Sequence, residues 1–204
     1  MQREVVIITG QTGAGKSSLA RRMFDETPRA FLVDADFKEF RCTYYDDYTL
    51  FVQHLSARGA FSDFRTPPGR LSYVPFRVGY TPLSSEHGLV FDTAAELGNL
   101  TLFLEEADRF ADPGQLPEYD EVITRGRHYG VSIVAISTHP FGLPKELRRQ
   151  ATRIIAFHQE ETSDLDYLAN RIGEAAYTLP KLPKFSYLDW APFAPIQKIT
   201  LDKP

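Results

Sequence analysis

Residues 10–17 read Gly10-Gln11-Thr12-Gly13-Ala14-Gly15-Lys16-Ser17, directly after the apolar run Val5–Thr9. This segment fits G-x-x-x-x-G-K-[ST], the pattern of the phosphate-binding P-loop. Glycines let the main chain approach an anion with no Cβ in the way, so that successive N–H groups point into one concavity. The N-terminus of the following helix adds partial positive charge. We therefore predict that the chain binds a nucleoside triphosphate.

Individual residues of this loop have distinct expected roles. We expect Lys16 to reach the β- and γ-phosphates and to act in catalysis, and the Ser17 hydroxyl to be a ligand for Mg²⁺. ATP and Mg²⁺ are the expected cofactors. A glycine-rich turn that binds nothing is the alternative, but a β-branched strand precedes the loop and a helical pattern follows it, as a P-loop requires. The residues expected to hold the nucleotide are Gln11, Thr12, Gly13, Ala14, Gly15, Lys16, Ser17 and Ser18.

Length and composition are those of an ordinary soluble globular domain. The 204 residues, 43% hydrophobic and 25% charged, predict one domain over residues 1–204 with a full core. The single cysteine, Cys42, excludes a disulfide framework and fits a reducing compartment. No apolar run reaches 18 residues, so we expect neither a signal peptide nor membrane insertion. The net charge of −4 argues against a protein that coats nucleic acid through overall basicity, although a local basic loop or a ring remains compatible with DNA binding.

Apolar runs alternate with helical patterns along the chain, which predicts an α/β fold with a mostly parallel sheet flanked by helices. We see no internal repeat and expect no second domain. The expected strands are Val5–Thr9, Ala30–Asp34, Leu71–Val78, Leu100–Leu104, Val131–Ser137, Arg153–Phe157 and Ile196–Leu201. The expected helices are Lys16–Asp25, Asp46–Ala57, Ser84–Leu97, Glu118–Tyr129, Lys145–Gln150 and Glu161–Ile172, with a loop at Arg65–Arg70.

Two acidic residues, Glu105 and Glu106, end the apolar strand that begins at Leu100. A buried strand places such carboxylates at the edge of the sheet where the P-loop lies. We expect Glu105 to hold Mg²⁺ directly or through water, the Walker B role, and Glu106 to polarise the attacking water. Neighbouring side chains on a strand point to opposite faces, which would suit two distinct roles. A solvated acidic turn is the alternative.

Four further segments resemble those of one family. Residues 105–110 (EEADRF) are similar to the D-E-A-H-R-F motif of FtsK/HerA-type DNA-pumping ATPases. Residues 125–140 (RGRHYGVSIVAISTHP) resemble the family's G-R-x-x-G-hydrophobic-strand-T-Q-R-P segment. Residues 152–157 (TRIIAF) resemble its S-R-I-A-F strand, and residues 34–39 (DADFKE) resemble its D-P-H-G-E loop. With the P-loop, these segments follow the family's order.

The chain most resembles the genome-packaging ATPases of tailless icosahedral viruses with an internal membrane. That resemblance implies a RecA-like P-loop core, a three-layer sandwich, that drives double-stranded DNA into a preformed capsid. It also implies a homo-oligomer, usually a hexameric ring, that contacts capsid vertex proteins. The implied location is the cytoplasm of the infected host cell and the vertex of the virion.

The resemblance also assigns two further residues. Arg127 occupies the position of the arginine finger, which acts on a neighbouring subunit's γ-phosphate. Its competitors are Arg125 and Arg153, and the plain alternative is an arginine that favours the C-terminus of a helix. Thr138 occupies the sensor position, where the family commonly has Gln; the plain alternative is that it caps a loop.

Three basic clusters are candidates for DNA contact, and the sequence does not select among them. Each is also compatible with an ordinary solvated face. Residues 181–190 are expected to complete the core, with packing near the adenine or against a neighbour as the alternative. The basic clusters are Lys145, Arg148 and Arg149; Arg65, Arg70 and Arg77; and Lys38 and Arg41.

Other functions remain as rivals to a packaging motor. A P-loop kinase of a nucleotide or small metabolite would use Arg125 and Arg127 as a lid, but adjacent acids such as Glu105 and Glu106 are typical of enzymes that hydrolyse with water. A HerA-like cellular translocase is a second rival within the same superfamily. A filamentous-phage assembly protein normally carries a membrane span, and a nucleotide-dependent switch would hydrolyse slowly regardless of DNA.

Overall fold

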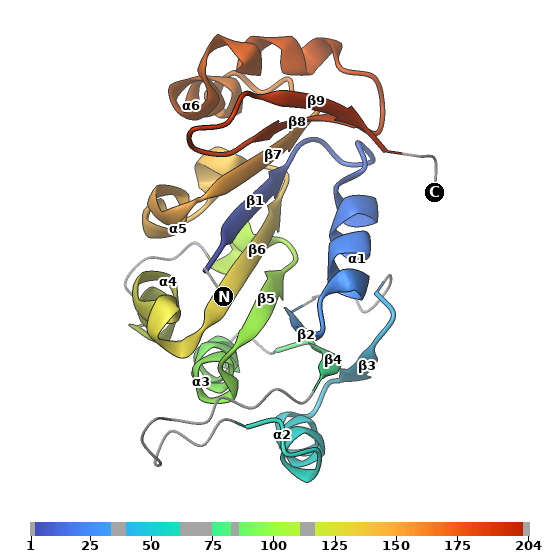
Figure 1. Ribbon diagram of the computed structural model, residues 1–204, viewed down its shortest axis with the longest axis vertical. Helices are drawn as coiled ribbons and strands as arrows, with labels where there is room; N and C mark the ends of the chain where they lie inside the picture. The colour runs from blue at the N-terminus through green and yellow to red at the C-terminus, as the bar shows by residue number, and fades with distance from the viewer. Residues whose placement is uncertain (1–2, 34–39, 62–74, 83–85, 111–116, 202–204) are drawn as a thin grey trace.

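The computed structural model of the chain describes residues 3–33, 40–61, 75–82, 86–110 and 117–201. Its described strands form one sheet in the order β3-β4-β2-β5-β6-β1-β7-β8-β9 (Figure 1). The strands are β1 (Val5–Thr9), β2 (Arg29–Val33), β3 (Thr43–Tyr45), β4 (Phe76–Tyr80), β5 (Leu100–Leu104), β6 (Val131–Ser137), β7 (Arg153–Phe157), β8 (Ser186–Trp190) and β9 (Gln197–Thr200). The α-helices are α1 (Lys16–Glu26), α2 (Tyr48–Ala57), α3 (His87–Leu97), α4 (Pro117–Tyr129), α5 (Lys145–Gln150) and α6 (Thr162–Ile172). The 3-10 helices are η2 (Ala107–Phe110), η3 (Pro140–Gly142) and η4 (Gly173–Lys181).

The order of the strands brings the carboxyl ends of three of them together. β1 lies between β6 and β7, and the pairings from β3 through β7 are parallel. Thr9 of β1 lies beside Ser137 of β6, and Leu104 of β5 lies beside Ala135. β8 and β9 extend the sheet beyond β7 in antiparallel pairs. The ends of β1, β5 and β6 therefore form one edge, which is where α/β folds place their ligands.

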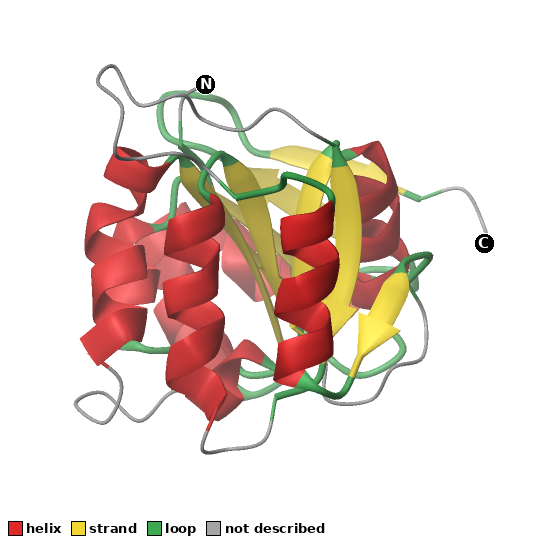
Figure 2. Ribbon diagram, turned by 90° about the horizontal axis from the view of Figure 1, so that it is seen from below, coloured by secondary structure: helices red, strands yellow, loops and turns green. Residues whose placement is uncertain are grey.

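Helices cover both faces of the sheet, but unequally (Figures 1 and 2). On one face α1 packs through side chains such as Leu19 and Phe24, while α2 to α6 bury apolar side chains against the other face. Because both faces of β1 are covered, all five of its residues are buried, which explains its continuous apolar sequence. The three-layer arrangement with a mostly parallel sheet confirms the predicted fold class. Among the described helices, none has the length and apolar character needed to cross a membrane.

Most predicted elements agree with the structure. The expected strands at Val5–Thr9, Leu100–Leu104, Val131–Ser137 and Arg153–Phe157 are confirmed in their bounds. The helices are confirmed within three residues at either end. The helix expected from Ser84 begins at His87, with residues 83–85 outside the described part of the chain.

The expected strand Leu71–Val78 was wrong in its bounds. The strand observed is Phe76–Tyr80, and it pairs with β2 in parallel register. It begins directly after Pro75, which has no N–H to donate to a neighbouring strand. Residues 71–74 and the predicted loop at 65–70 lie outside the described residues.

Two strands were not predicted. β3 has three residues, all at least partly exposed, at the edge of the sheet, which is too short to show a two-residue period. β8 contains a serine and an aspartate that interrupt its apolar pattern. The structure satisfies both, because Ser186 Oγ lies 2.8 Å from Thr200 Oγ1 and Asp189 forms an ion pair with Arg153 of β7.

A buried arginine joins separate segments at the edge opposite the P-loop. Arg29, only 4% exposed, donates to the main-chain oxygens of Ala60, Leu97, Gly98 and Asn99 at 2.9–3.1 Å. Its guanidinium also lies 4.6 Å from the centre of the Phe76 ring. Burial lowers the pKa of Arg29 to about 10, which leaves it protonated at neutral pH. The fixed fork of five donors on a guanidinium suits such a set of carbonyls.

Replacing Arg29 should therefore destabilise the protein strongly. Arg29→Ala leaves several buried carbonyls without a donor, and we expect the free energy of unfolding to fall by about 3 kcal/mol or more. Arg29→Lys should recover only part of the loss, since an ammonium cannot reproduce the fork. The matched control is Arg22→Ala on the exposed face of α1, with an expected change within about 0.5 kcal/mol. Urea unfolding measures all three; equal effects of Arg29→Ala and Arg22→Ala would contradict the assignment.

Candidate nucleotide-binding site

The P-loop connects the end of β1 to the start of α1, and its glycines adopt backbone angles that other residues avoid. Gly10, Gly13 and Gly15 have φ of 139°, 77° and 122°. A Cβ on Gly10 would lie 2.7 Å from Phe157 Cβ, and one on Gly15 would lie 2.9 Å from Phe185 Cδ1. Gly13 has no atom within 4 Å of such a Cβ. Gly10 and Gly15 are therefore required by packing as well as by backbone angle.

The main-chain N–H groups of this loop fall into two sets, of which one is bonded to protein carbonyls. Gln11 N donates to His158 O at 2.8 Å and Ala14 N donates to Gln11 O at 3.2 Å. α1 has no side-chain cap and no acidic residue in its first turn. This arrangement is typical of helix N-termini that bind anions. Within the described residues, no acceptor takes a hydrogen bond from the N–H groups of Gly13, Gly15, Lys16 or Ser17.

The Lys16 ammonium is buried inside the loop. The residue is 8% exposed, and its Nζ donates to Gly10 O at 2.6 Å and to Gln11 O at 3.1 Å. An ammonium has three donors, so one remains for a phosphate oxygen. Burial lowers the pKa of Lys16, while the charges of Glu105 and Asp108 act in the opposite direction. Burial and the two carboxylates therefore act on the Lys16 pKa in opposite directions, with burial the larger effect.

The two predicted acids lie in a turn, so the argument from opposite faces of a strand was wrong. β5 ends at Leu104, and Glu106 has a left-handed φ of 48°. Glu105 N donates to Val33 O at 3.0 Å, which fixes the turn against β2. The Glu106 side chain, 48% exposed, pairs with Arg109 at 2.5 Å. The charge of Glu105 thus acts on Lys16, whereas Glu106 points to a surface ion pair.

A buried amide that sequence reasoning missed lies beside the predicted sensor. Thr138, directly after β6, has its main-chain oxygen bonded to Gln159 Nε2 at 2.9 Å. Gln159 is 1% exposed, and the same nitrogen donates to Asp164 Oδ2 at 2.9 Å. Asp164 also lies 3.1 Å from His139 Nδ1. No periodic pattern in the sequence signals this network, because Gln159 and Asp164 lie on different elements from Thr138.

A pocket of about 420 Å³ opens beside the loop. The segment that precedes β8 lies against the P-loop, since Phe185 N donates to Ala14 O at 3.0 Å. Residues 181–190 thus complete the core, as expected, and two of them also border the pocket, while packing near an adenine stays a prediction. The pocket is lined by Gln11, Thr12, Gly13, Ala14, His158, Leu182 and Lys184.

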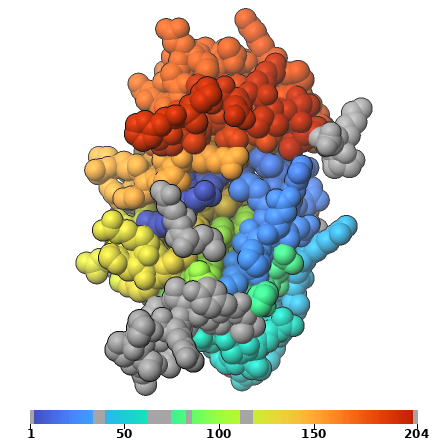
Figure 3. Space-filling model, viewed as in Figure 1, coloured from blue at the N-terminus to red at the C-terminus, as the bar shows by residue number. Residues whose placement is uncertain are grey.

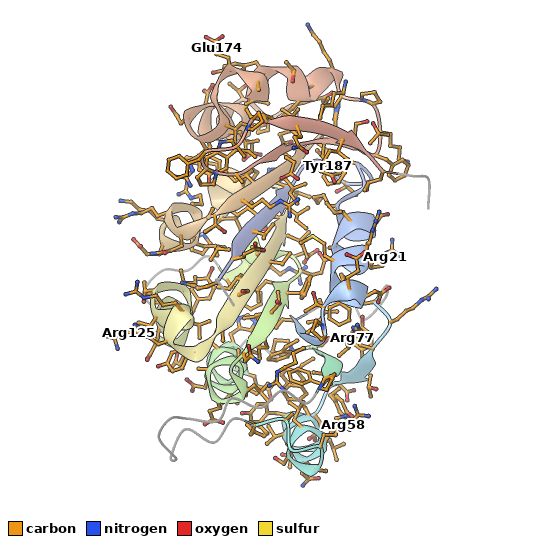
Figure 4. All side chains as sticks on the ribbon, in the orientation of Figure 1. Arg21, Arg58, Arg77, Arg125, Glu174 and Tyr187 are labelled. Atoms are coloured by element: carbon orange, nitrogen blue, oxygen red, sulfur yellow. The ribbon has the colours of Figure 1, made fainter. Side chains whose placement is uncertain are left out.

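The candidates for the arginine finger lie at the edge of the sheet opposite to the P-loop. Arg125 and Arg127 are exposed near the C-terminal end of α4, and Figure 4 shows Arg125 projecting away from the sheet. Arg3 packs beneath this end of the helix and donates to Val122 O, Ile123 O and Val131 O. Arg153, in contrast, forms two hydrogen bonds with Asp189, at 2.8 and 2.5 Å.

The structure describes only some residues of the three basic clusters. Arg65, Arg70 and Lys38 lie outside the described residues. Arg77 donates to the main-chain oxygens of Phe24, Asp25 and Thr27, so it fixes the end of α1 (Figure 4). On α5, Arg148 lies 5.2 Å from the ring centres of Phe141 and Tyr167, and Arg149 pairs with Glu146.

The donor set near the loop fits Mg²⁺ only together with a triphosphate. In the part of the chain that the structure describes, no group of three or more His, Cys, Asp or Glu side chains could hold a metal ion. Mg²⁺ commonly takes one or two protein ligands and completes its six oxygens with phosphates and waters. Ser17 and Glu105 are the residues that would supply those ligands here.

The difference between Gly13 and Gly15 can be tested by substitution. Gly13→Ala adds only backbone strain, with an expected loss of about 1–2 kcal/mol in the free energy of unfolding. Gly15→Ala adds a clash with Phe185 and Phe157, for a total loss of about 2–4 kcal/mol. Chemical unfolding of the two variants checks this order. Equal losses would show that the C-terminal segment does not press on the loop.

Comparison with known proteins supports the fold. No family model and no curated protein matches the chain. The genome-packaging NTPase B204 of Sulfolobus turreted icosahedral virus 2, in complex with AMPPCP, is 17% identical, with 97% of this chain and 98% of that chain covered and a TM-score of 0.73. The sulfate complex of B204 is 16% identical over the whole of both chains, with a TM-score of 0.75.

Two further solved structures are also similar. VirB4 of Thermoanaerobacter pseudethanolicus is 13% identical, with 98% of this chain and 89% of that chain covered and a TM-score of 0.60. The N-terminal domain of zonular occludens toxin from Neisseria meningitidis is 16% identical, with 100% and 96% covered and a TM-score of 0.55. Identities this low establish the fold alone. In its fold, the chain resembles the P-loop ATPases of the FtsK/HerA type, and among them a viral genome-packaging NTPase over its full length.

Proposed function

We propose that this chain is a single P-loop domain that hydrolyses ATP as one subunit of a motor that translocates double-stranded DNA. The observation that carries the proposal is the P-loop itself, where N–H groups without protein acceptors surround a buried Lys16. The likeness to B204, which was solved with AMPPCP, AMP and ATPγS, supports a nucleotide as the ligand. The same likeness supports a viral genome as the DNA and a preformed capsid as its destination.

The residues around the loop divide the work of hydrolysis. The loop residues from Gln11 to Ser18 form the phosphate site, in which the N–H groups of Gly13, Gly15, Lys16 and Ser17 and the Lys16 ammonium bind the phosphates. Ser17 and Glu105 would hold the Mg²⁺, which would supply charge neutralisation. Glu106 polarises the water that attacks the γ-phosphorus. Its ion pair with Arg109 is exposed and therefore weak, so releasing the carboxylate costs little. Thr138, held by Gln159, acts as the sensor at the end of β6.

The position of Arg127 favours a shared site. It lies at the amino-terminal edge of the sheet, whereas its own P-loop lies at the carboxyl-terminal edge. An arginine placed there can serve the γ-phosphate only of a neighbouring subunit, so the proposed assembly is a closed ring, with six subunits expected. Arg153 is a weaker candidate, because Asp189 already pairs with it.

The remaining partners follow from this proposal. The ring would contact DNA phosphates through basic side chains, for which α5 is the described candidate, and would dock on capsid vertex proteins. It would work in the cytoplasm of the infected cell and at the vertex of the virion. A P-loop kinase is the main rival, and it would transfer the γ-phosphate to a small acceptor rather than to water.

The first test measures binding and turnover together. Lys16→Ala should lose ATP affinity or hydrolysis, because the loop then lacks its central cation. Wild-type protein should release phosphate faster when double-stranded DNA is added, and the stimulation should weaken as salt rises. Phosphate release without any effect of DNA, together with phosphorylation of a nucleotide acceptor, would support the kinase instead.

The second test asks whether the site is shared. Arg127→Ala should abolish turnover while ATP affinity stays nearly unchanged, and Arg125→Ala is the matched control that keeps turnover. Mixing inactive Arg127→Ala and Lys16→Ala subunits should restore activity, since about one interface in four joins an intact loop to an intact arginine. No recovery on mixing, or loss of ATP affinity in an Arg127→Ala monomer, contradicts a finger acting in trans.

A further inference from the structure

Asp108 is a carboxylate of this site to which the sequence assigned no role. It lies in η2, just after the turn that carries Glu105 and Glu106. Its Oδ1 accepts a hydrogen bond from Ser137 Oγ at 2.9 Å. Ser137 is the last residue of β6, beside Thr9 of β1 in the parallel register. Asp108 is therefore fixed at the edge of the sheet, one strand away from the P-loop.

The hydroxyl that holds Asp108 is itself fixed. Ser137 Oγ accepts a hydrogen bond from His139 N at 3.0 Å, which leaves its single proton for the Asp108 carboxylate. Ser137 is 2% exposed, so little water competes for this proton. A hydroxyl oriented in this way determines where the other Asp108 oxygen can point.

Glu105 and Asp108 both lie at the carboxyl edge of the sheet, where the P-loop also lies. Glu105 directly follows β5, and Asp108 is bonded to Ser137, the last residue of β6, which pairs with Thr9 of β1. Glu106 instead pairs with Arg109 on the surface. Glu106 is therefore held at the surface, whereas Asp108 is held at the end of β6.

A magnesium ion at this loop would bring waters that need acceptors. Mg²⁺ dehydrates reluctantly and keeps several waters when one or two protein side chains bind it. Ser17 and Glu105 are the expected direct ligands, and the described residues contain no third acidic or histidine ligand grouped with them. A carboxylate fixed just beyond the ligands is the usual means by which proteins orient such waters.

We propose that Asp108, held by Ser137, accepts hydrogen bonds from the water shell of the magnesium ion that accompanies the triphosphate. Asp108 is then a positioning residue, because it acts through water and does not touch the reacting phosphate. The inference rests on the proposed nucleotide site. It adds a third acidic residue to that site and links the metal to the end of β6, next to the sensor Thr138.

The test is the affinity of the full chain for Mn²⁺, used in place of Mg²⁺, in the presence of AMPPCP. Free Mn²⁺ is followed by its EPR signal. Asp108→Asn keeps the shape and the acceptor for Ser137 but removes the charge, and it should raise the Kd of Mn²⁺ by about 10- to 100-fold. Ser137→Ala should raise it by a smaller factor. The control Asp25→Asn, exposed at the far end of α1, should leave it unchanged.

Three results would overturn the proposal. The first is wild-type Mn²⁺ affinity in Asp108→Asn. The second is loss of metal-free AMPPCP binding or of thermal stability in that variant, which shows a structural role. Ser137→Ala leaves the acid in place, so wild-type Mn²⁺ affinity in this variant overturns the proposal even where Asp108→Asn fails to fold. ATP hydrolysis by wild-type protein is measured in parallel: a chain that binds Mn²⁺ with AMPPCP but never hydrolyses ATP contradicts the motor and leaves the metal result standing.

Discussion

The buried ammonium of Lys16 is the feature on which the rest of the site depends. It is hydrogen-bonded to two carbonyls of its own loop, at Gly10 and Gln11, so the lysine holds the loop in shape before any phosphate arrives. A buried cation needs compensating charge, and Glu105 and Asp108 supply it. A triphosphate that binds at the loop would bring more negative charge to the Lys16 ammonium than these two carboxylates provide. The site is therefore arranged in advance for an anion.

Segments far from the P-loop in sequence keep it in this shape. Phe157 at the end of β7 and Phe185 before β8 lie against Gly10 and Gly15. Gln11 Nε2 also reaches Glu160 Oε2 at 3.3 Å. Figure 3 shows the C-terminal strands lying beside α1 on one face of the molecule, where a second pocket of about 370 Å³ separates them. The antiparallel extension of the sheet thus supports the nucleotide site and does more than finish the core.

The sequence predicted the parts of the fold that local patterns determine. β1, β5, β6 and β7 are buried on both faces, so each reads as a continuous apolar run with clear ends, and the P-loop motif fixed the position of the site. β3 and β8 could not be predicted, because one is too short and the other contains polar residues satisfied only by partners elsewhere in the sheet. β4 begins directly after Pro75, which has no N–H to donate to a neighbouring strand. This limit on the strand can be recognised only when β2 is known to be the partner of β4.

In the site, too, local motifs predicted some residues, whereas others depend on contacts between distant segments. Lys16, Ser17 and Glu105 were assigned from motifs, and in the structure the charge of Glu105 raises the pKa of Lys16 against the effect of burial. The turn at Glu106 was not foreseen, because a left-handed φ at a glutamate has no signal in the sequence. Gln159, Asp164 and Asp108 gained their significance only from three-dimensional contacts between elements.

The most direct test of this account is a crystal structure of the chain with Mg²⁺ and AMPPCP. The account predicts the β-phosphate within hydrogen-bonding distance of the N–H groups of Gly13, Gly15 and Lys16, and the Lys16 ammonium in contact with phosphate oxygens. A nucleotide bound elsewhere, with Lys16 still bonded only to Gly10 and Gln11, would contradict it.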